Sequence, residues 1–166
     1  MLEGGLRPPD PPPLADPLKP PPAVIVYTDG ACRGNPGPGG WAALILDGKE
    51  EHAVSGGEPY TTNQRMELRA AIEALASLAG ERLVMLYTDS SYVMNCFRDR
   101  WWEKWERNGW LGAMKRPVTN RDLWERLIAE TRRHSVTWYK VKGHSGDPLN
   151  DRVDRLAREA SRAVVS

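Results

Sequence analysis

The sequence predicts an α/β (α+β) protein with a five-stranded mixed sheet that is flanked by helices. Five segments have strand-like patterns, three of them consecutive and the other two separated by helical segments. Two of the strand segments end in the same three residues, Tyr-Thr-Asp, and a helical segment between them favours a parallel pair. Because 166 residues suffice for one compact domain of ordinary size, we expect a single core.

Residues 1–22 hold nine of the 14 prolines in the chain. Proline has no N–H to donate to a sheet and cannot continue a helix, so we expect an extended or disordered tail here. The folded domain is then predicted over residues 23–166. A proline-rich tail could also dock into an aromatic groove of another protein, but a passive extension is the simpler interpretation.

The first half of the domain predicts an antiparallel meander followed by a helix. Strand signals lie at residues 23–29, 41–47 and 52–57, with glycine-rich turns between the first two. The next segment places apolar residues at helical spacing and ends at Gly80. These apolar residues are Leu68, Ala71, Ile72, Leu75 and Leu78.

The second half alternates strands and helices. Residues 83–89 form an apolar run that predicts a strand buried on both faces. A tryptophan-rich helical region to about Gly109, a loop at 111–117, a helix at 120–132 and a strand at 135–141 follow. Asp147 and Pro148 predict the capped start of a last helix. That helix should bury Val153, Leu156, Ala157 and Ala160.

Composition excludes several classes of protein. The formal net charge of +1 argues against nucleic-acid binding over the whole surface, so any basic footprint must be local. Cys32 and Cys96 are too few for a disulfide framework, which favours a reducing compartment. No apolar run is long enough to span a bilayer, so we expect a cytoplasmic protein with no membrane partner.

Asp29 and Asp89 close the two matching strands. If these strands are parallel neighbours, both carboxylates lie at the same edge of the sheet, where ligands of open α/β sheets bind. A divalent cation would relieve their repulsion, and oxygen ligands favour magnesium or manganese over zinc. The alternative is that each aspartate only begins a turn, as Asp-Gly and Asp-Ser pairs commonly do.

Three further residues could join the two aspartates. Glu67 lies on or beside the apolar stripe of its helix, although a first-turn glutamate also favours the helix dipole. Asp154 flanks the stripe of the last helix, where an ion pair with Arg158 is the alternative. His144 lies in a glycine-containing loop, in which a lone histidine is usually only solvated.

Four segments of the chain resemble the ribonuclease HI family, and the match runs from about Val24 to Ala160. The segments are YTDGACRGNPGPGGW at 27–41, TTNQRMEL at 61–68, YTDS at 87–90 and VKGH at 141–144. The resemblance implies the ribonuclease H-like fold and an endonuclease that hydrolyses the RNA strand of RNA–DNA hybrids. Its products would carry 5′-phosphate and 3′-hydroxyl ends.

The resemblance also implies the catalytic residues. Asp29, Glu67, Asp89 and Asp154 would form a four-carboxylate site for two Mg²⁺ ions with substrate bound, with Mn²⁺ as a possible substitute. His144 would assist proton transfer or product departure. Two-metal catalysis needs no covalent intermediate, and the sequence contains no nucleophile motif. The implied enzyme acts as a monomer.

By the same resemblance, a further set of residues would contact the hybrid. The 2′-hydroxyl distinguishes RNA from DNA, and it would be contacted from Cys32, Gly34, Asn35, Asn63 and Gln64. Asn35, Thr62 and Arg65 would hold a phosphate of the DNA strand, a contact that positions the duplex without reading its sequence. The remaining substrate-binding positions are Trp101, Asn120 and Trp124.

The segment 98–133 resembles the basic protrusion of the family. It contains ten Lys or Arg and six Asp or Glu residues, a net charge of +4, and five of the seven tryptophans. Tryptophans at helical spacing usually pack in a core, so we expect only Trp101 and Trp124 to face DNA. This segment is less basic than the family pattern, and Gln64 and Ser91 replace a common asparagine and a common glutamine.

Two other functions fit the same fold. Another nuclease or a transposase-like enzyme would lack the segments that contact the 2′-hydroxyl, and these are intact. A catalytically silent hybrid-binding module would lack one of the acids, and none is missing.

Overall fold

The computed structural model of the protein describes residues 22–142 and 146–164. A five-stranded mixed sheet has the strand order β3-β2-β1-β4-β5. Its strands are β1 (Val24–Cys32), β2 (Gly37–Asp47), β3 (Glu50–Thr61), β4 (Leu83–Thr88) and β5 (Ser135–Lys140). The helices are α1 (Asn63–Ala76), α2 (Ser91–Arg98), α3 (Trp101–Asn108), α4 (Arg121–Arg133) and α5 (Pro148–Ala163), with a short 3-10 turn η1 (Ala113–Lys115).

The sheet topology confirms the prediction made from the repeated Tyr-Thr-Asp. β1, β2 and β3 form an antiparallel meander. β1 and β4 are parallel neighbours, with Tyr27 opposite Tyr87 and Thr28 opposite Thr88. The two strands therefore end in register, as their matching sequences require.

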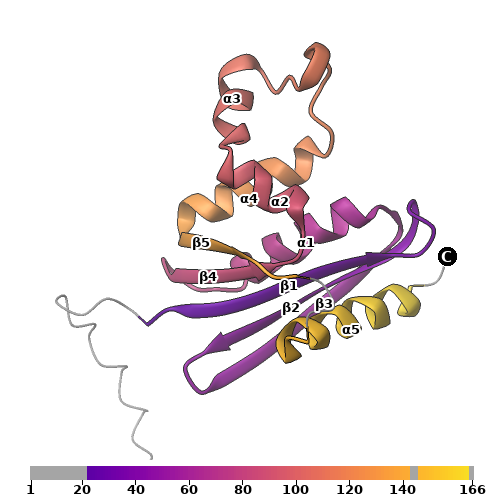
Figure 1. Cartoon of the computed structure of the whole chain (residues 1–166), viewed down its shortest axis with the longest axis vertical. Helices are drawn as coiled ribbons and strands as arrows, with labels where there is room; N and C mark the ends of the chain where they lie inside the picture. Colours follow the sequence, from indigo (N-terminus) through magenta and orange to yellow (C-terminus); the bar gives the residue numbers. More distant parts are fainter. Residues whose placement is uncertain (1–21, 143–145, 165–166) are drawn as a thin grey trace, which may run out of the picture.

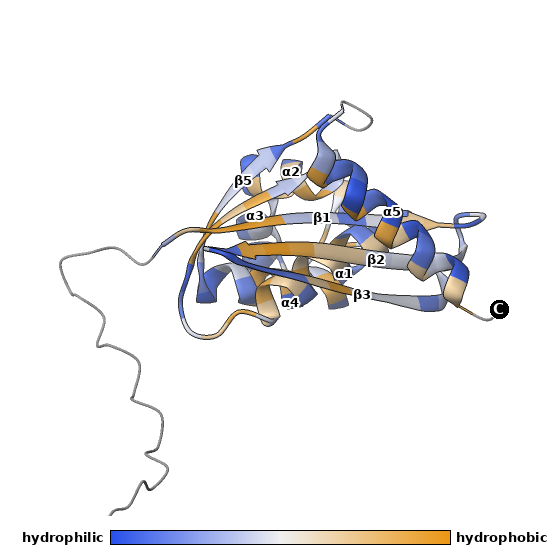
Figure 2. Cartoon of the chain, turned by 90° about the horizontal axis from the view of Figure 1, so that it is seen from below, coloured by the Kyte–Doolittle hydropathy of each residue, from blue (hydrophilic) through white to orange (hydrophobic). Residues whose placement is uncertain are grey.

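Helices cover both faces of the sheet, as predicted (Figure 1). α1, α2 and α4 lie on one face and enclose the larger hydrophobic core, in which Val26 and Leu86 meet Ile72. α5 covers the other face and packs Val153 and Ala157 against the sheet. Figure 2 shows hydrophobic residues concentrated on β1 and β2, with hydrophilic residues on the outer side of α5. α3 and the loop after it project away from the sheet.

Side-chain hydrogen bonds fix where the helices begin. Thr62 Oγ1 accepts from the backbone N–H of Arg65 at 3.2 Å and caps α1. Asp147 Oδ1 accepts from the N–H of Leu149 at 3.0 Å, which confirms the predicted cap of α5. Such caps satisfy N–H groups that have no partner within the helix.

Two burial predictions need correction. β4 is not buried on both faces, because α5 lies over β1, β2 and β3 and leaves Tyr87 half-buried on that side. In α5, Val153 and Ala157 are buried as predicted, but Leu156 and Ala160 are half-buried. Asn150 and Ser161 take the other buried positions of that helix. Small side chains suit this face because the helix backbone passes close to Gly40, where an added Cβ would lie 2.4 Å from the carbonyl oxygen of Ala157.

The tryptophan-rich region is two helices rather than one. Arg100, between α2 and α3, has a left-handed backbone with φ of 55°, which interrupts the helical hydrogen bonds. Residues 1–21 of the predicted tail lie outside the described part of the chain, so that prediction is untested. No helix among the described residues has both the length and the apolar character needed to cross a membrane.

Candidate active site

Asp29 and Asp89 lie side by side at the edge of the sheet. Pairing between β1 and β4 ends at Thr28 and Thr88. Asp29 is the next residue of β1, and Asp89 directly follows β4. Asp29 is only 6% exposed. The register of two parallel strands therefore places two carboxylates together, with Asp29 buried and Asp89 half-buried.

Glu67 reaches this edge because α1 packs very closely on β1. A Cβ added at Gly30 would lie 2.6 Å from the backbone nitrogen of Glu67, so the approach requires the glycine that follows Asp29. Glu67 Oε2 accepts a hydrogen bond from Ser90 Oγ at 2.6 Å. Ser90 follows Asp89 and also caps α2, so one serine ties the Glu67 carboxylate to the end of β4.

Asp154 approaches the other acids from α5, on the opposite face of the sheet. Its Oδ2 lies 2.5 Å from Arg158 Nη2, one helical turn further on. The ion pair considered as the alternative for this residue is therefore present. Asp154 still lies close enough to Asp29 to raise the pKa of that carboxyl. We call the end of β1 and β4 where Asp29, Glu67, Asp89 and Asp154 lie the acidic edge.

The electrostatics of the acidic edge favour protonation in the absence of a cation. Burial, the charge of Asp89 and the hydrogen bond with Asp154 raise the pKa of Asp29 to about 8. Burial and the charge of Asp154 raise the pKa of Asp89. Burial also raises the pKa of Glu67, although the hydrogen bond from Ser90 opposes this. The surroundings therefore do not stabilise the negative charge that the acidic edge would carry with all its carboxyl groups ionised.

The four acids do not converge on a single point. Within residues 22–142 and 146–164, no three His, Cys, Asp or Glu side chains are grouped closely enough to hold a metal ion. Ser90 holds Glu67 and Arg158 holds Asp154, so both carboxylates already have partners. His144, the fifth predicted catalytic residue, lies outside the described part of the chain.

The predicted contacts for the 2′-hydroxyl gather where the loop between β1 and β2 meets the start of α1. Asn35 Oδ1 accepts from the backbone N–H of Asn63 at 3.0 Å. Cys32 Sγ lies 3.3 Å from the carbonyl oxygen of Thr61. Gly34 adopts φ of 85°, which favours glycine, and Gln64 is exposed in the first turn of α1. These residues form one polar surface beside Asp29.

Arg65 connects this surface to α4. Its guanidinium donates two hydrogen bonds to Asp122, at 3.0 and 2.8 Å, and a third to Asn120 Oδ1 at 3.2 Å. Asn120 Nδ2 in turn donates to the hydroxyl of Tyr92 at 3.2 Å. The predicted phosphate and DNA contacts are thus joined in one network across three helices.

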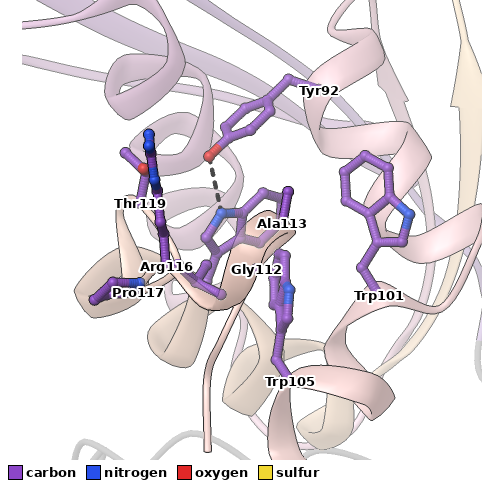
Figure 3. Close-up of a pocket in the computed structure, with 10 residues that line it drawn as sticks. Tyr92, Trp101, Trp105, Gly112, Ala113, Arg116, Pro117 and Thr119 are labelled. Carbon is purple, nitrogen blue, oxygen red and sulfur yellow. Dashed lines mark hydrogen bonds between the residues drawn. The ribbon is translucent and has the colours of Figure 1, made fainter. Parts of the chain in front are cut away.

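Trp101 and Trp124 occupy different environments. They line an open pocket of about 310 Å³ together with Tyr92 and Trp105 (Figure 3). Trp101 is half-buried, whereas Trp124 is completely buried and donates Nε1–H to the Tyr92 hydroxyl at 2.9 Å. Trp124 therefore supports the pocket wall. Because its side chain has no exposed surface in this conformation, it cannot make the predicted direct contact with DNA.

Three residues with clear structural roles at the site were not predicted. Ser90 could have been identified from its position between a strand and a helix, where serine is a common cap. Tyr92 and Asp122 carry no sequence signal of this kind, because their partners Trp124 and Arg65 are distant in the chain.

Comparisons with known proteins agree with this architecture. The family model for RNase H matches residues 21–162. A ribonuclease H of Moorella thermoacetica is 55% identical over 141 residues, which cover 85% of this chain and 93% of the relative. The crystal structure of LC9-RNase H1, a type 1 RNase H with the type 2 active-site motif, has a TM-score of 0.77 at 32% identity and covers 87% of this chain and 74% of that chain.

A second crystal structure, LC11-RNase H1 in complex with an RNA/DNA hybrid, shares the fold with a TM-score of 0.63 at 24% identity. It covers 84% of this chain and 96% of that chain. The family model spans the strands and helices that carry the four acids. The chain belongs to the ribonuclease H family of metal-dependent endoribonucleases.

Proposed function

We propose that the chain hydrolyses the RNA strand of RNA–DNA hybrids by two-metal-ion catalysis and leaves 5′-phosphate and 3′-hydroxyl ends. The observation that carries the proposal is the pair of carboxylates, Asp29 and Asp89, at the adjoining ends of two parallel strands, with Glu67 and Asp154 beside them. The hybrid bound to LC11-RNase H1, a protein of the same fold, supports this choice of substrate.

The residues at the acidic edge have the donor chemistry that magnesium prefers. Asp29, Glu67, Asp89 and Asp154 offer only carboxylate oxygens as ligands. The raised pKa of Asp29 supports the same assignment, because a buried carboxylate with an acidic neighbour is stabilised in its charged form by a cation. We propose that these four residues hold Mg²⁺, or Mn²⁺ in its place.

Bound divalent cations supply activation of the attacking water and stabilisation of the leaving oxygen. The chain positions the reacting groups. Asp29 and Asp89 are fixed by the sheet, whereas Glu67 and Asp154 must exchange their contacts with Ser90 and Arg158 to turn toward the cations. His144 is proposed to move a proton or to help the cleaved end depart, since an unperturbed imidazole titrates near neutral pH.

Selection of a hybrid follows from two neighbouring sets of residues that meet at the start of α1. The polar groups at Cys32, Asn35 and Asn63 are proposed to contact 2′-hydroxyls of the RNA strand. Gly34 and Gln64 belong to the same surface. Thr62 and Arg65 are proposed to hold a phosphate of the DNA strand, and Trp101 and Asn120 to extend that contact. All of these groups come from one chain, so the reaction needs no second subunit and we expect a monomer acting in the cytoplasm.

A cleavage assay tests the proposal. End-labelled RNA–DNA, RNA–RNA and DNA–DNA duplexes of one sequence are incubated with the protein in Mg²⁺, in Mn²⁺ and in EDTA, and the product ends are mapped. We expect cleavage of the RNA strand of the hybrid alone, only with a divalent cation. Asp151→Asn, which alters an exposed acid of α5, is the matched control for the four acids. Equal cleavage of RNA–RNA, or cleavage in EDTA, would contradict the proposal.

A further inference from the structure

A second pocket lies beside the acidic edge, and two of the arginines that line it, Arg33 and Arg162, have no role in the reaction described above. It has a volume of about 330 Å³ and lies between the end of β1, the first residue of α1 and the last turns of α5. Its lining includes Cys32, Asn63 and Ser161 together with three arginines, Arg33, Arg158 and Arg162. No acidic residue is part of this lining.

The three arginines make the pocket strongly positive. Among the described residues, no carboxylate pairs with Arg33 or Arg162, although most other arginines of this part of the chain have an acidic partner. Arg158 does pair with Asp154, at 2.5 Å. At least two positive charges therefore remain uncompensated in a protein whose formal net charge is only +1.

Arg33 is held in place by the backbone of α5. Its Nη2 donates to the carbonyl oxygen of Ser161 at 2.9 Å and lies 3.5 Å from that of Val164. Figure 1 shows the connection between β1 and β2 beside the C-terminal end of this helix. One edge of the guanidinium is thus fixed, and its remaining N–H groups are available to an anion. A preformed guanidinium fork suits the paired oxygens of a phosphate.

Residues of one side of α5 connect the acidic edge to the pocket. Asp154, Arg158 and Arg162 follow one another at intervals of four residues, on one side of the helix, with a rise of about 6 Å at each step. The carboxylate at one end of this row lies near Asp29, and the arginines at the other end line the pocket. A nucleic-acid strand that crosses the acids and runs along α5 would meet the arginines next.

We propose that this arginine pocket, formed by Arg33, Arg158 and Arg162, binds a backbone phosphate of the RNA strand next to the phosphate that is cleaved. This inference rests on the proposed function, which places the RNA strand over the four acids and its 2′-hydroxyls against Cys32 and Asn63. Both of these residues line the pocket, which favours the RNA strand over the DNA strand as its ligand. Arg158 links the two sites, since a phosphate in the pocket competes with Asp154 for its guanidinium.

Binding in EDTA tests the pocket without any cleavage. Fluorescence anisotropy gives the dissociation constant of a labelled RNA–DNA hybrid between 50 and 200 mM KCl, values chosen to span the range over which phosphate contacts respond to salt. For the double variant Arg33→Gln, Arg162→Gln we expect binding about tenfold weaker at the middle of this range and a salt slope smaller by about 1 to 2. The double variant Arg155→Gln, Lys49→Gln also removes two exposed positive charges and should change binding less than about twofold.

A cleavage experiment identifies the strand. A short ribonucleotide block within a DNA strand confines cleavage to one place, and neutral methylphosphonate linkages are placed at single positions beside it in either strand. We expect one such linkage in the ribonucleotide-containing strand to lower kcat/KM about tenfold for the wild type and to leave the Arg33→Gln, Arg162→Gln variant unchanged. The same pattern for linkages in the opposite strand would overturn the assignment to RNA.

Arg33 also bonds to carbonyl groups at the end of α5, so its substitution could weaken binding by destabilising the fold. Thermal melts distinguish this effect from the loss of a phosphate contact. Arg33→Lys keeps the charge and should recover much of the binding lost in Arg33→Gln. If Arg33→Gln and Arg162→Gln lower only the melting temperature and leave the salt slope unchanged, the arginines are structural and the proposal is wrong. If the wild type cleaves no hybrid but the difference in salt slope persists, the proposed function fails while the phosphate site stands.

Discussion

The acidic edge and the tryptophan-rich projection are built in opposite ways. The acidic edge consists of Asp29, Glu67, Asp89 and Asp154, and it rests on the neighbouring strands β1 and β4 and on helices that bury their apolar faces. The projection consists of residues 99–119, and its helix α3 has no fully buried residue. Four left-handed non-glycine residues, Arg100, Trp110, Met114 and Lys115, lie within it.

The two regions meet different requirements: the acidic edge needs exact positions, whereas the projection needs only to extend toward the duplex. Metal-binding acids must be placed within fractions of an ångström, and strand register and close helix packing fix the backbone positions that carry them. The projection is held mainly by contacts among aromatic rings, such as Trp105 with Trp124 at 5.4 Å and Trp105 with Trp110 at 5.6 Å. A less rigid region can still contact the phosphate backbone of a duplex, because phosphate contacts position the duplex and carry no sequence code. Substitutions in the two regions should therefore differ in kind.

The largest effect is expected at the acidic edge. Asp29→Asn removes a charge but almost no volume, so cleavage in Mg²⁺ should fall by more than about 10⁴-fold while the fold is retained. Asp89→Asn should behave in the same way. Single-turnover cleavage and a circular-dichroism melt measure the two properties, with Asp151→Asn as the control. Near-normal turnover of a folded Asp29→Asn or Asp89→Asn protein would remove the two-metal hypothesis.

A smaller loss of rate is expected for His144→Ala. A group that moves a proton contributes about 10²- to 10⁴-fold, so kcat should fall within that range with little change in KM. Calorimetric titration should show Mg²⁺ binding essentially as in the wild type, which distinguishes this residue from the four acids. Cleavage at the normal rate would mean that His144 is a solvated loop residue.

Trp101 in the projection and Trp124 in α4 should give contrasting results. Trp124→Ala removes a completely buried indole and should cost about 3–5 kcal/mol of unfolding free energy. Trp101→Ala removes a half-buried ring and should instead weaken hybrid binding by about 1–3 kcal/mol, the range for loss of an aromatic contact with a nucleic acid. Denaturant unfolding and anisotropy measure the two effects. Equal stability losses for both variants would show that Trp101 is also a packing residue.

The pH dependence of stability sharpens the account of the acidic edge. The folded pKa of Asp29, raised to about 8, lies above the value near 4 of an unfolded chain, so the native state binds more protons between these values. In EDTA, stability should therefore fall as pH rises from about 4 to about 8. For Asp29→Asn the melting temperature should fall less as pH rises, and at pH 9 it should be higher than that of the wild type. Thermal melts at pH 5, 7 and 9 measure this. Saturating Mg²⁺ should raise the wild-type melting temperature more than that of the variant.

The sequence predicted the fold and the position of the acids because these depend on local patterns. The repeated Tyr-Thr-Asp fixed the register of β1 and β4, and the Asp147-Pro148 pair marked the start of α5. The break at Arg100 was missed because no glycine or proline marks it. The burial of Trp124 was missed because it depends on Tyr92 and Phe97, which belong to another helix. The arginine pocket likewise joins Arg33 to residues more than 120 positions away, a proximity that only the packing of α5 creates.

The smallest effect is expected from the segment that belongs to neither region. Residues 1–22 are rich in proline and contain few apolar groups that folding could bury, so their deletion should leave the melting temperature and hybrid cleavage nearly unchanged. Pro22 marks the place where such an effect could arise, since its carbonyl oxygen lies 3.4 Å from Arg82 Nη2, and Arg82 is also paired with Asp47. Deletion of residues 1–21 keeps this contact and is the matched control. A loss of several degrees on deletion of 1–22 but not of 1–21 would assign the effect to Pro22. A loss in both would show that the proline-rich segment packs on the domain.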